Sequence, residues 1–199
     1  MPDTEPRSAS QPLTEEQIRQ ATIGEPTRVN GPITLVEYDP AWPDHFACEE
    51  RRIRDALGER ALRIEHIGST AVPRLIAKPI IDILLVVADS ADEPAYVPAL
   101  EAAGYVLRIR EPDWDEHRLF KGPEIDVNLH VYTQGSDEIE RYLLLRDRLR
   151  ENAADRDLYA QTKRDLAARH WTYVQNYADA KSEVVEAIIA RARAASVQG

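Results

Sequence analysis

The chain has 199 residues, of which 43% are hydrophobic and 30% are charged, values typical of a globular protein with a substantial core. Its formal net charge of −10 argues against nonspecific binding to DNA or RNA, which needs a basic surface, so we expect no nucleic-acid partner. No apolar run has the length of a membrane span, the polar start has no signal-peptide core, and the single cysteine, Cys48, allows no intrachain disulfide. These features predict a cytoplasmic protein without a membrane partner.

The first part of the chain differs in composition from the rest. Residues 1–28 are rich in Pro, Thr, Ser, Glu and Gln, which predicts a flexible leader ahead of a single domain over residues 29–199. Within this leader, Thr14 and Gln17 have the spacing of a capping box and predict a short helix over residues 14–22.

From residue 33 onward, the hydrophobic pattern predicts strands and helices in one domain. We expect a first strand over residues 33–38, an amphipathic helix over 42–57 that Gly58 ends, and a short strand over 61–67. The strand expected over 79–88 is apolar on both faces, which is typical of a central strand.

The second half of the domain is predicted to begin with strands and to end with helices. We expect, in order, a helix over 93–103, an edge strand over 105–110, a hairpin formed by 117–121 and 125–132, and three helices over 138–150, 155–170 and 172–193. The sum is an α+β fold with a sheet of about five strands and a helical C-terminal third.

The most informative segment lies between residues 65 and 87. Its turn of small residues, Gly68-Ser69-Thr70, lets backbone N–H groups approach an anion closely. The apolar strand that follows carries one carboxylate, Asp82, which is costly to bury unless it is paired, hydrogen-bonded or bound to a metal. Turn and strand together predict a phosphate-binding loop beside a metal-binding carboxylate. Lys78, four residues before Asp82, is either a solvated strand-end charge or a phosphate contact.

A second acidic strand, over residues 124–132, has its polar side chains on one face. Because side chains alternate along a strand, Asp126, Asn128 and His130 share this face. The face is either solvated or gathers around a metal together with Asp82. Oxygen ligands suit Mg²⁺ or Mn²⁺, and a histidine favours Mn²⁺ or Zn²⁺.

Other candidate residues have a structural and a functional interpretation. His66, at a strand end, is typical of a satisfied structural histidine. Arg118 either clamps a phosphate through its planar fork or pairs with a surface carboxylate. Tyr159 and Lys163 share a helix face that either packs at the edge of the core or closes over a nucleotide. Trp114, in a polar loop, is the candidate for stacking on a ligand.

Several catalytic signatures are absent from the sequence. There is no P-loop, no G-x-S-x-G elbow around Ser69, and no CxxC or HExxH motif. The sequence therefore does not predict a P-loop NTPase, a serine hydrolase of this type, or a recognisable zinc site.

Separate segments resemble, in the same order, the GrpB-like family, whose members are similar to minimal polymerase-beta-like nucleotidyltransferases. The resemblance covers about residues 34–192. Its most specific pieces are EYDPAW at 37–42, HIGSTAVP at 66–73, AKPIIDI at 77–83, HRLF at 117–120 and NLHV at 128–131. The resemblance implies a nucleotidyltransferase-like mixed sheet.

The resemblance also implies roles for individual residues. The small-residue turn would hold the triphosphate of an NTP and Asp82 would bind a divalent metal. Asp126 or His130 would stand near the position of the family's third acid, which activates the attacking hydroxyl. The residues expected to contact the nucleotide are Gly68, Ser69, Thr70, Lys78, Arg118 and Lys163. The residues expected to act in catalysis and metal binding are Asp82, Asp126 and His130.

The sequence departs from the superfamily motif at the second acid. That acid should stand two residues after Asp82, and Leu84 is there instead. Either Asp126, Asn128 or His130 replaces the missing ligand, or the fold binds a nucleotide without transferring it. Arg74 also stands where relatives commonly have glycine.

Three functions follow as expectations. The first is a Mg²⁺- or Mn²⁺-dependent nucleotidyltransferase that moves NMP from ATP or another NTP to an unknown small acceptor. The second is a noncatalytic module that binds a nucleotide or a phosphorylated metabolite. The third is a different transferase or ligase on the same scaffold.

Overall fold

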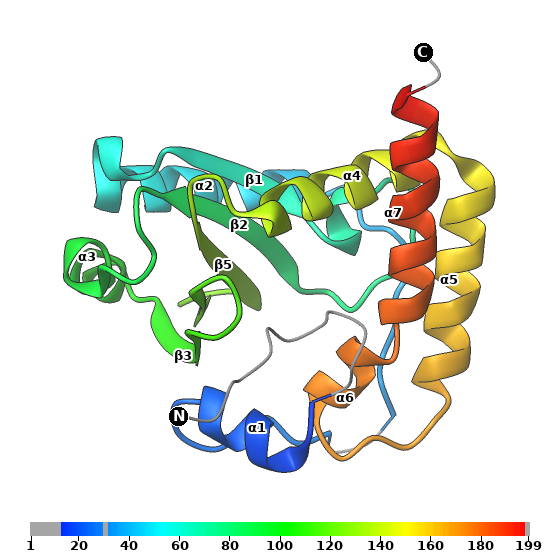
Figure 1. Cartoon of the computed structure of the whole chain (residues 1–199), viewed down its shortest axis with the longest axis horizontal. Coiled ribbons are helices and arrows are strands. Elements are labelled where there is room, and N and C mark those ends of the chain that lie inside the picture. Colours follow the sequence, from blue (N-terminus) through cyan, green and yellow to red (C-terminus); the bar gives the residue numbers. More distant parts are fainter. Residues whose placement is uncertain (1–12, 30–31, 198–199) are drawn as a thin grey trace.

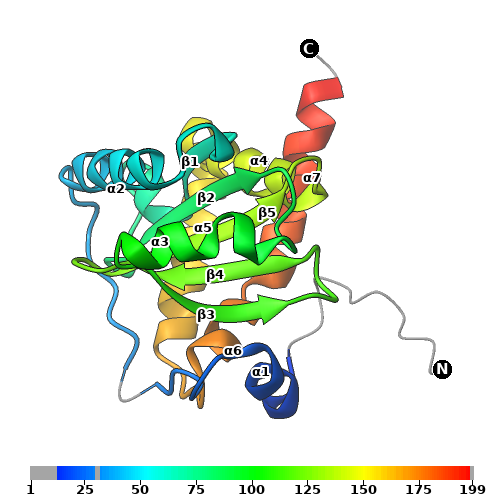
Figure 2. The same ribbon diagram turned by 90° about the vertical axis from the view of Figure 1, so that its left-hand side faces the viewer.

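The centre of the protein is a five-stranded mixed sheet (Figure 1), and its strand order β1-β2-β5-β4-β3 can be followed in Figure 2. The strands of this computed structural model, which describes residues 13–29 and 32–197, are β1 (Arg63–Ile67), β2 (Ile81–Val87), β3 (Val106–Glu111), β4 (His117–Lys121) and β5 (Val127–Thr133). Strands β2 and β5 run parallel, and the other neighbouring pairs are antiparallel. The predicted α+β class, the interior position of β2 and the edge position of β3 are confirmed.

The helices lie on both sides of this sheet (Figure 2). They are α1 (Glu15–Ala21), α2 (Trp42–Leu57), α3 (Val97–Ala102), α4 (Asp137–Glu151), α5 (Ala153–Ala167), α6 (Val174–Asp179) and α7 (Ser182–Val197). In Figure 2, α2 and α3 lie on one side of the sheet and α4, α5 and α7 on the other. The helical C-terminal third is therefore confirmed.

Alternation along β2 explains why two different sets of helices can cover the sheet. Ile83 and Leu85 join the larger core beneath α2 and α3. Leu84 and Val86, on the opposite face, pack with Tyr142 and its neighbours on α4. Asp82 shares this second face but lies near the start of β2, outside the apolar cluster of Leu84 and Val86. This end of the face is therefore polar and can form a site.

Three predicted elements are wrong in their extent. Residues 33–38 form no strand, only a single bridge between Val36 and Ala77. The segment that contains Ala77 continues to Pro79, which has no N–H to donate to a further strand hydrogen bond. The helix expected over 172–193 is divided, because α6 buries Tyr177 before α7 turns to pack Ile188 against α4 and α5. The segment 93–103 is likewise a short 3₁₀ turn, Glu93–Ala95, followed by α3.

The first described residues contact the domain. Helix α1 has the predicted capping box between Thr14 and Gln17. Ile18 is buried in a small cluster with Tyr173, and Thr22 forms a bridge with Ile109 of β3. Residues 1–12 of the expected leader lie outside the described residues. No helix in the described part of the chain has the length and apolar character needed to cross a membrane.

Candidate functional site

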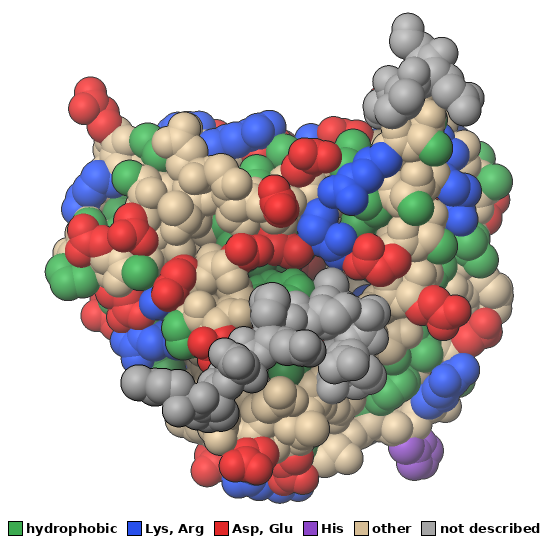
Figure 3. Space-filling view, viewed as in Figure 1, with side chains coloured by type: hydrophobic (Ala, Val, Ile, Leu, Met, Phe, Trp, Pro, Cys, Tyr) green, Lys and Arg blue, Asp and Glu red, His purple; other side chains and the backbone are tan. Residues whose placement is uncertain are grey.

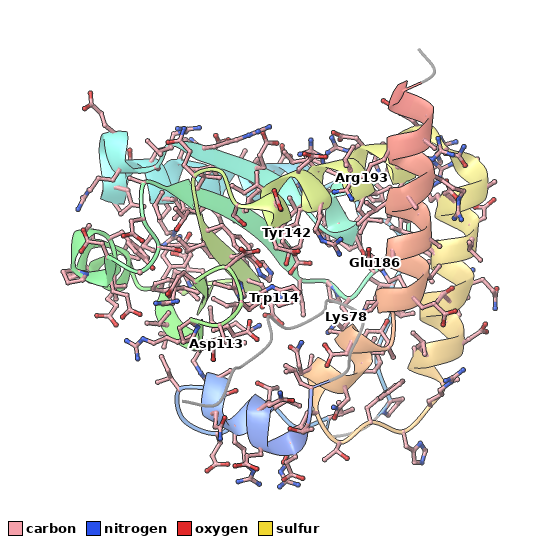
Figure 4. The ribbon with its side chains drawn as sticks, in the orientation of Figure 1. Lys78, Asp113, Trp114, Tyr142, Glu186 and Arg193 are labelled. Carbon is pink, nitrogen blue, oxygen red and sulfur yellow. The ribbon has the colours of Figure 1, made fainter. Side chains whose placement is uncertain are left out.

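A cleft of about 810 Å³ opens on the polar end of the sheet face that α4 partly covers. Its lining comes from β2, β4 and β5, from the turn after β1, and from α4, α5, α6 and α7. Figure 3 shows acidic and basic side chains close together around this hollow. Figure 4 shows Lys78, Trp114, Tyr142 and Glu186 around the same opening, although they come from distant parts of the sequence. The volume lies in the usual range for a small-molecule site.

Asp82 lies in this cleft, beside the side chains of β5. The parallel register pairs it with Asn128, whose Nδ2 donates to Asp82 Oδ1 at 2.7 Å. His130 Nε2 lies 3.9 Å from the same oxygen. Burial by itself would raise the pKa of Asp82, but the charged form of His130, the bond from Asn128 and the charge of Lys78 outweigh it and hold the pKa below its ordinary value. Asp82 is therefore a carboxylate near neutral pH.

The turn after β1 brings its backbone against this carboxylate. Gly68 has a φ of +71°, in the region that favours glycine. A Cβ atom at this position would lie 2.5 Å from Asp82 Oδ2. Ser69 follows at the edge of the cleft. The close approach of turn and strand is the arrangement predicted from Gly68, Ser69 and Asp82.

Three lysines from separate elements also line the cleft. They are Lys78 in the loop before β2, Lys163 on α5, and Lys181 between α6 and α7. Lys163 is 3% exposed, and its ammonium donates to the carbonyl oxygen of Ile76 at 2.6 Å. Lys181 donates to the carbonyl of Tyr177 at 3.1 Å. Among the described residues, no carboxylate forms an ion pair with any of the three.

Burial in the cleft lowers the pKa of all three lysines. Burial lowers the pKa of Lys163 to about 7, although the charge of Asp82 opposes the shift. Burial also lowers the pKa of Lys181 to about 7, and the charges of Lys78 and Lys163 lower it further. The pKa of Lys78 is lowered mainly by burial too. A bound anion would offset these penalties, because it favours the protonated form of each lysine.

The structure brings most of the predicted site residues together. Those that line the cleft are Gly68, Ser69, Lys78, Asp82, Asp126, Asn128, His130 and Lys163. Trp114 also lines it, and its stacking on a ligand stays a prediction.

Two predicted nucleotide contacts lie elsewhere. Arg118 pairs with Val131 in the sheet register, so it faces the side covered by α3, where its guanidinium binds Glu93 at 2.7 Å. The alternative that it pairs with a carboxylate is therefore correct. Thr70 is buried and is bonded to His66 Nε2 at 3.0 Å, with its hydroxyl also donating to the carbonyl of Ile80.

His66 itself has a structural role, as expected. Its ring stacks on Phe46 with the ring centroids 4.8 Å apart. Burial lowers the pKa of His66 to about 4, so this imidazole is neutral at physiological pH.

The expected metal-binding set is not assembled. In residues 13–29 and 32–197, no group of three or more His, Cys, Asp and Glu side chains is arranged to hold a metal ion. Asp126 lies at the exposed rim, where Lys121 Nζ binds its Oδ1 at 2.9 Å. Leu84, at the place of the second acid, is fully buried under α4. A single carboxylate that already accepts a bond from Asn128 does not fit a pair of divalent ions.

Sequence reasoning missed two parts of the site. Lys181 falls within the single helix predicted over 172–193. The break between α6 and α7 places it at the cleft instead. The strand predicted over 105–110 stops before Glu111, but β3 includes this residue, and its Oε2 lies 2.8 Å from His117 Nδ1. Once the register of β3 and β4 is known, the alternation of side chains along them predicts that Glu111 and His117 lie on the same face.

A sequence model described as GrpB protein matches residues 32–191. The chain belongs to the GrpB family. A UPF0157 protein of Halalkalibacterium halodurans is 58% identical over 194 residues, 98% of this chain and 100% of that protein. One from Streptomyces coelicolor is 50% identical over 163 residues, 82% of this chain and 86% of that protein. The crystal structure of the conserved protein GrpB from Enterococcus faecalis superposes with a TM-score of 0.70 at 33% identity, covering 80% of this chain and 96% of that chain.

Proposed function

We propose that this GrpB-family protein binds a nucleotide or a related phosphate ester in the cleft. The phosphates lie between the Gly68-Ser69 turn and the lysines at positions 78, 163 and 181. The observation that carries the proposal is Lys163, a buried ammonium that lines the cleft with a backbone carbonyl as its acceptor and no carboxylate paired with it among the described residues. A buried cation without a counter-ion is unfavourable, and an anionic ligand supplies the missing charge.

Nucleotidyl transfer to a hydroxyl of a small acceptor is the reaction we propose for the bound nucleotide. The resemblance to nucleotidyltransferases supports it, as does the position of Asp82 and His130 beside the predicted phosphate site. In this proposal the lysines neutralise charge on the phosphates, because the donor set does not fit a pair of divalent ions.

Binding without transfer is the second candidate. Leu84 favours it, because a buried leucine stands where the superfamily motif has a metal-binding acid. The two candidates share the binding site and differ in turnover.

Calorimetric titration with ATP, ADP and AMP tests the binding proposal. We expect ATP to bind both in EDTA and in Mg²⁺ or Mn²⁺, since the lysines are part of the protein. The double variant Lys163→Met with Lys181→Met should lose most of the affinity, whereas Lys121→Met, at the exposed rim, should bind nearly as the wild type does. If no nucleotide binds at millimolar concentration with or without these metals, the proposal is wrong.

Pyrophosphate release separates the two candidates. Nucleotidyl transfer requires release of pyrophosphate from ATP in the presence of an acceptor, and Asp82→Ala should abolish it. Binding without any release, across a panel of hydroxyl-bearing acceptors, would support the noncatalytic module instead.

A further inference from the structure

A row of side chains crosses three strands and ends at the cleft. Glu111 Oε2 lies 2.8 Å from His117 Nδ1, and His117 Nε2 lies 3.1 Å from His130 Nδ1. The opposite ring nitrogen, His130 Nε2, is the one that lies 3.9 Å from Asp82 Oδ1. The sheet register explains the row, because β3 pairs Glu111 with His117 and β4 pairs Leu119 with His130. All these side chains therefore share the face that carries Asp82.

The middle of the row is buried, and the residues at its two ends, Glu111 and His130, are partly exposed. His117 is 5% exposed and stacks on Tyr132 with the ring centroids 4.8 Å apart. The ring of His130 stacks on that of His117 at 5.2 Å and contacts Tyr142 of α4 at 5.6 Å. His130 also lines the cleft. The buried His117 thus lies between Glu111 and a histidine that a ligand can reach.

The hydrogen bonds fix which nitrogen of each ring carries the proton. A carboxylate only accepts, so His117 Nδ1 must be the donor to Glu111. Burial lowers the pKa of His117, which keeps the ring neutral and leaves Nε2 as an acceptor. His130 Nδ1 must then donate to His117 Nε2. In the neutral His130 ring, the lone pair is therefore on Nε2, the nitrogen nearest Asp82.

We propose that Glu111 and His117 are positioning residues that hold His130 in this tautomer, so that its Nε2 takes the proton of a hydroxyl on the acceptor. This role rests on the proposed nucleotidyl transfer. The acceptor oxygen forms a bond to the α-phosphorus of the nucleotide, and its proton goes to His130 Nε2. The bond from that phosphorus to the bridging oxygen breaks, and pyrophosphate leaves with the electron pair.

The groups around His130 also stabilise its protonated form, which results from this proton transfer. Protonated His130 has donors on both nitrogens, with His117 Nε2 accepting from one and the carboxylate of Asp82 facing the other. The groups that face the ring are Asp82 from β2, His117 from β4 and Tyr142 from α4. The acceptor class in this step is a small molecule with a free hydroxyl group, since a carboxylate has no proton for the base to take.

Long-range ¹H–¹⁵N correlation of histidine-labelled protein without ligand tests the tautomers directly. We expect a proton on Nδ1 and a lone pair on Nε2 for both His117 and His130. Glu111→Leu, which offers His117 Nδ1 no acceptor, should populate the other tautomer of His130, whereas Glu111→Gln keeps an acceptor in its amide oxygen and should largely retain the wild-type tautomer. Glu93→Gln is the matched control, because Glu93 binds Arg118 and Arg110 on the opposite face and should leave the tautomers unchanged.

The outcomes separate this inference from the proposed function. A proton on Nε2 of neutral wild-type His130, or tautomers unaltered in Glu111→Leu, overturns the positioning role. In transfer assays, Glu111→Leu should lower the rate at least tenfold with the affinity for ATP unchanged, and an unaltered rate in a variant whose spectra show the other tautomer overturns the assignment of His130 as the base. Absence of nucleotide binding to the wild type would overturn the proposed function and the base role, while the tautomer assignment would be decided by the spectra alone.

Discussion

Replacing Lys163 by methionine is expected to weaken nucleotide binding at least about tenfold, because hydrogen bonds to charged groups contribute about 1.5–3 kcal/mol. The free energy of unfolding at pH 7 should be unchanged or higher in the same variant. Methionine fills a similar volume beside Tyr159 and removes a buried charge, which offsets the loss of the bond to the carbonyl of Ile76. Titration calorimetry and urea unfolding measure the two quantities.

The opposite directions of these two effects make the variant informative. A lysine that served only to hold α5 against the loop at Ile76 would lose stability on replacement and leave binding unaltered. Lys121→Met is the matched control, since Lys121 is an exposed lysine of the same cleft that already pairs with Asp126. Equal binding losses in the two variants would contradict a specific role for Lys163.

The lowered pKa of Lys163 also fixes the sign of a pH effect. Its pKa is about 7 in the folded protein against 10.5 for an ordinary lysine, so between these values the unfolded chain binds more protons. The penalty for burying the charge is therefore complete below about pH 7 and disappears as the pH rises toward 10.5. Unfolding free energies measured across this window should rise less steeply in Lys163→Met than in the wild type.

Replacing Gly68 by alanine is expected to destabilise the fold by about 2–3 kcal/mol, which combines a strained backbone with a collision. The φ of +71° disfavours any side chain, and the new Cβ would lie 2.5 Å from Asp82 Oδ2. Relief of that collision must move either the turn or the carboxylate, so nucleotide affinity should fall as well. Denaturant unfolding and titration with ATP measure the two effects.

Gly135→Ala separates the two contributions. Gly135 has a φ of +93°, but a Cβ there would meet no atom within 4 Å. This variant should therefore show the backbone strain alone, with a smaller loss of stability and unaltered binding. A loss at Gly68 no larger than the loss at Gly135 would mean that the turn does not press on Asp82.

Helix ends and strand faces could be predicted from the sequence, because each depends on residues that are close together in the chain. Gly58 ends the helix that begins at Trp42, and the capping box of Thr14 and Gln17 places α1. Period-two alternation gave the faces of β5 correctly, with Asn128 and His130 on the side of Asp82. Each of these features depends on residues within one element.

The errors concern contacts that depend on tertiary packing. Residues 33–38 have the composition of a strand, but no continuous partner edge lies beside them. The planar guanidinium of Arg118 suits a phosphate and a carboxylate equally well, so its sequence alone does not decide between them. The register of β4 instead turns it to the opposite face, where Glu93 from a distant turn binds it.

The composition of the site was also only partly predictable. The three lysines come from positions 78, 163 and 181, and no spacing rule relates them. The contact between Glu111 and His117 requires the pairing of β3 with β4. Asp126 shares the predicted face, yet it lies beyond the strand end, where Lys121 pairs with it in solvent.

A crystal structure of the protein with a nonhydrolysable ATP analogue, soaked once with EDTA and once with Mn²⁺, tests the central claim most directly. We predict phosphate oxygens within hydrogen-bonding distance of Lys163 Nζ and of Ser69 in both soaks, with a ribose or acceptor pocket on the side of His130. An analogue ordered outside this cleft, or a cleft that stays free of phosphate at saturating concentration, would contradict the account.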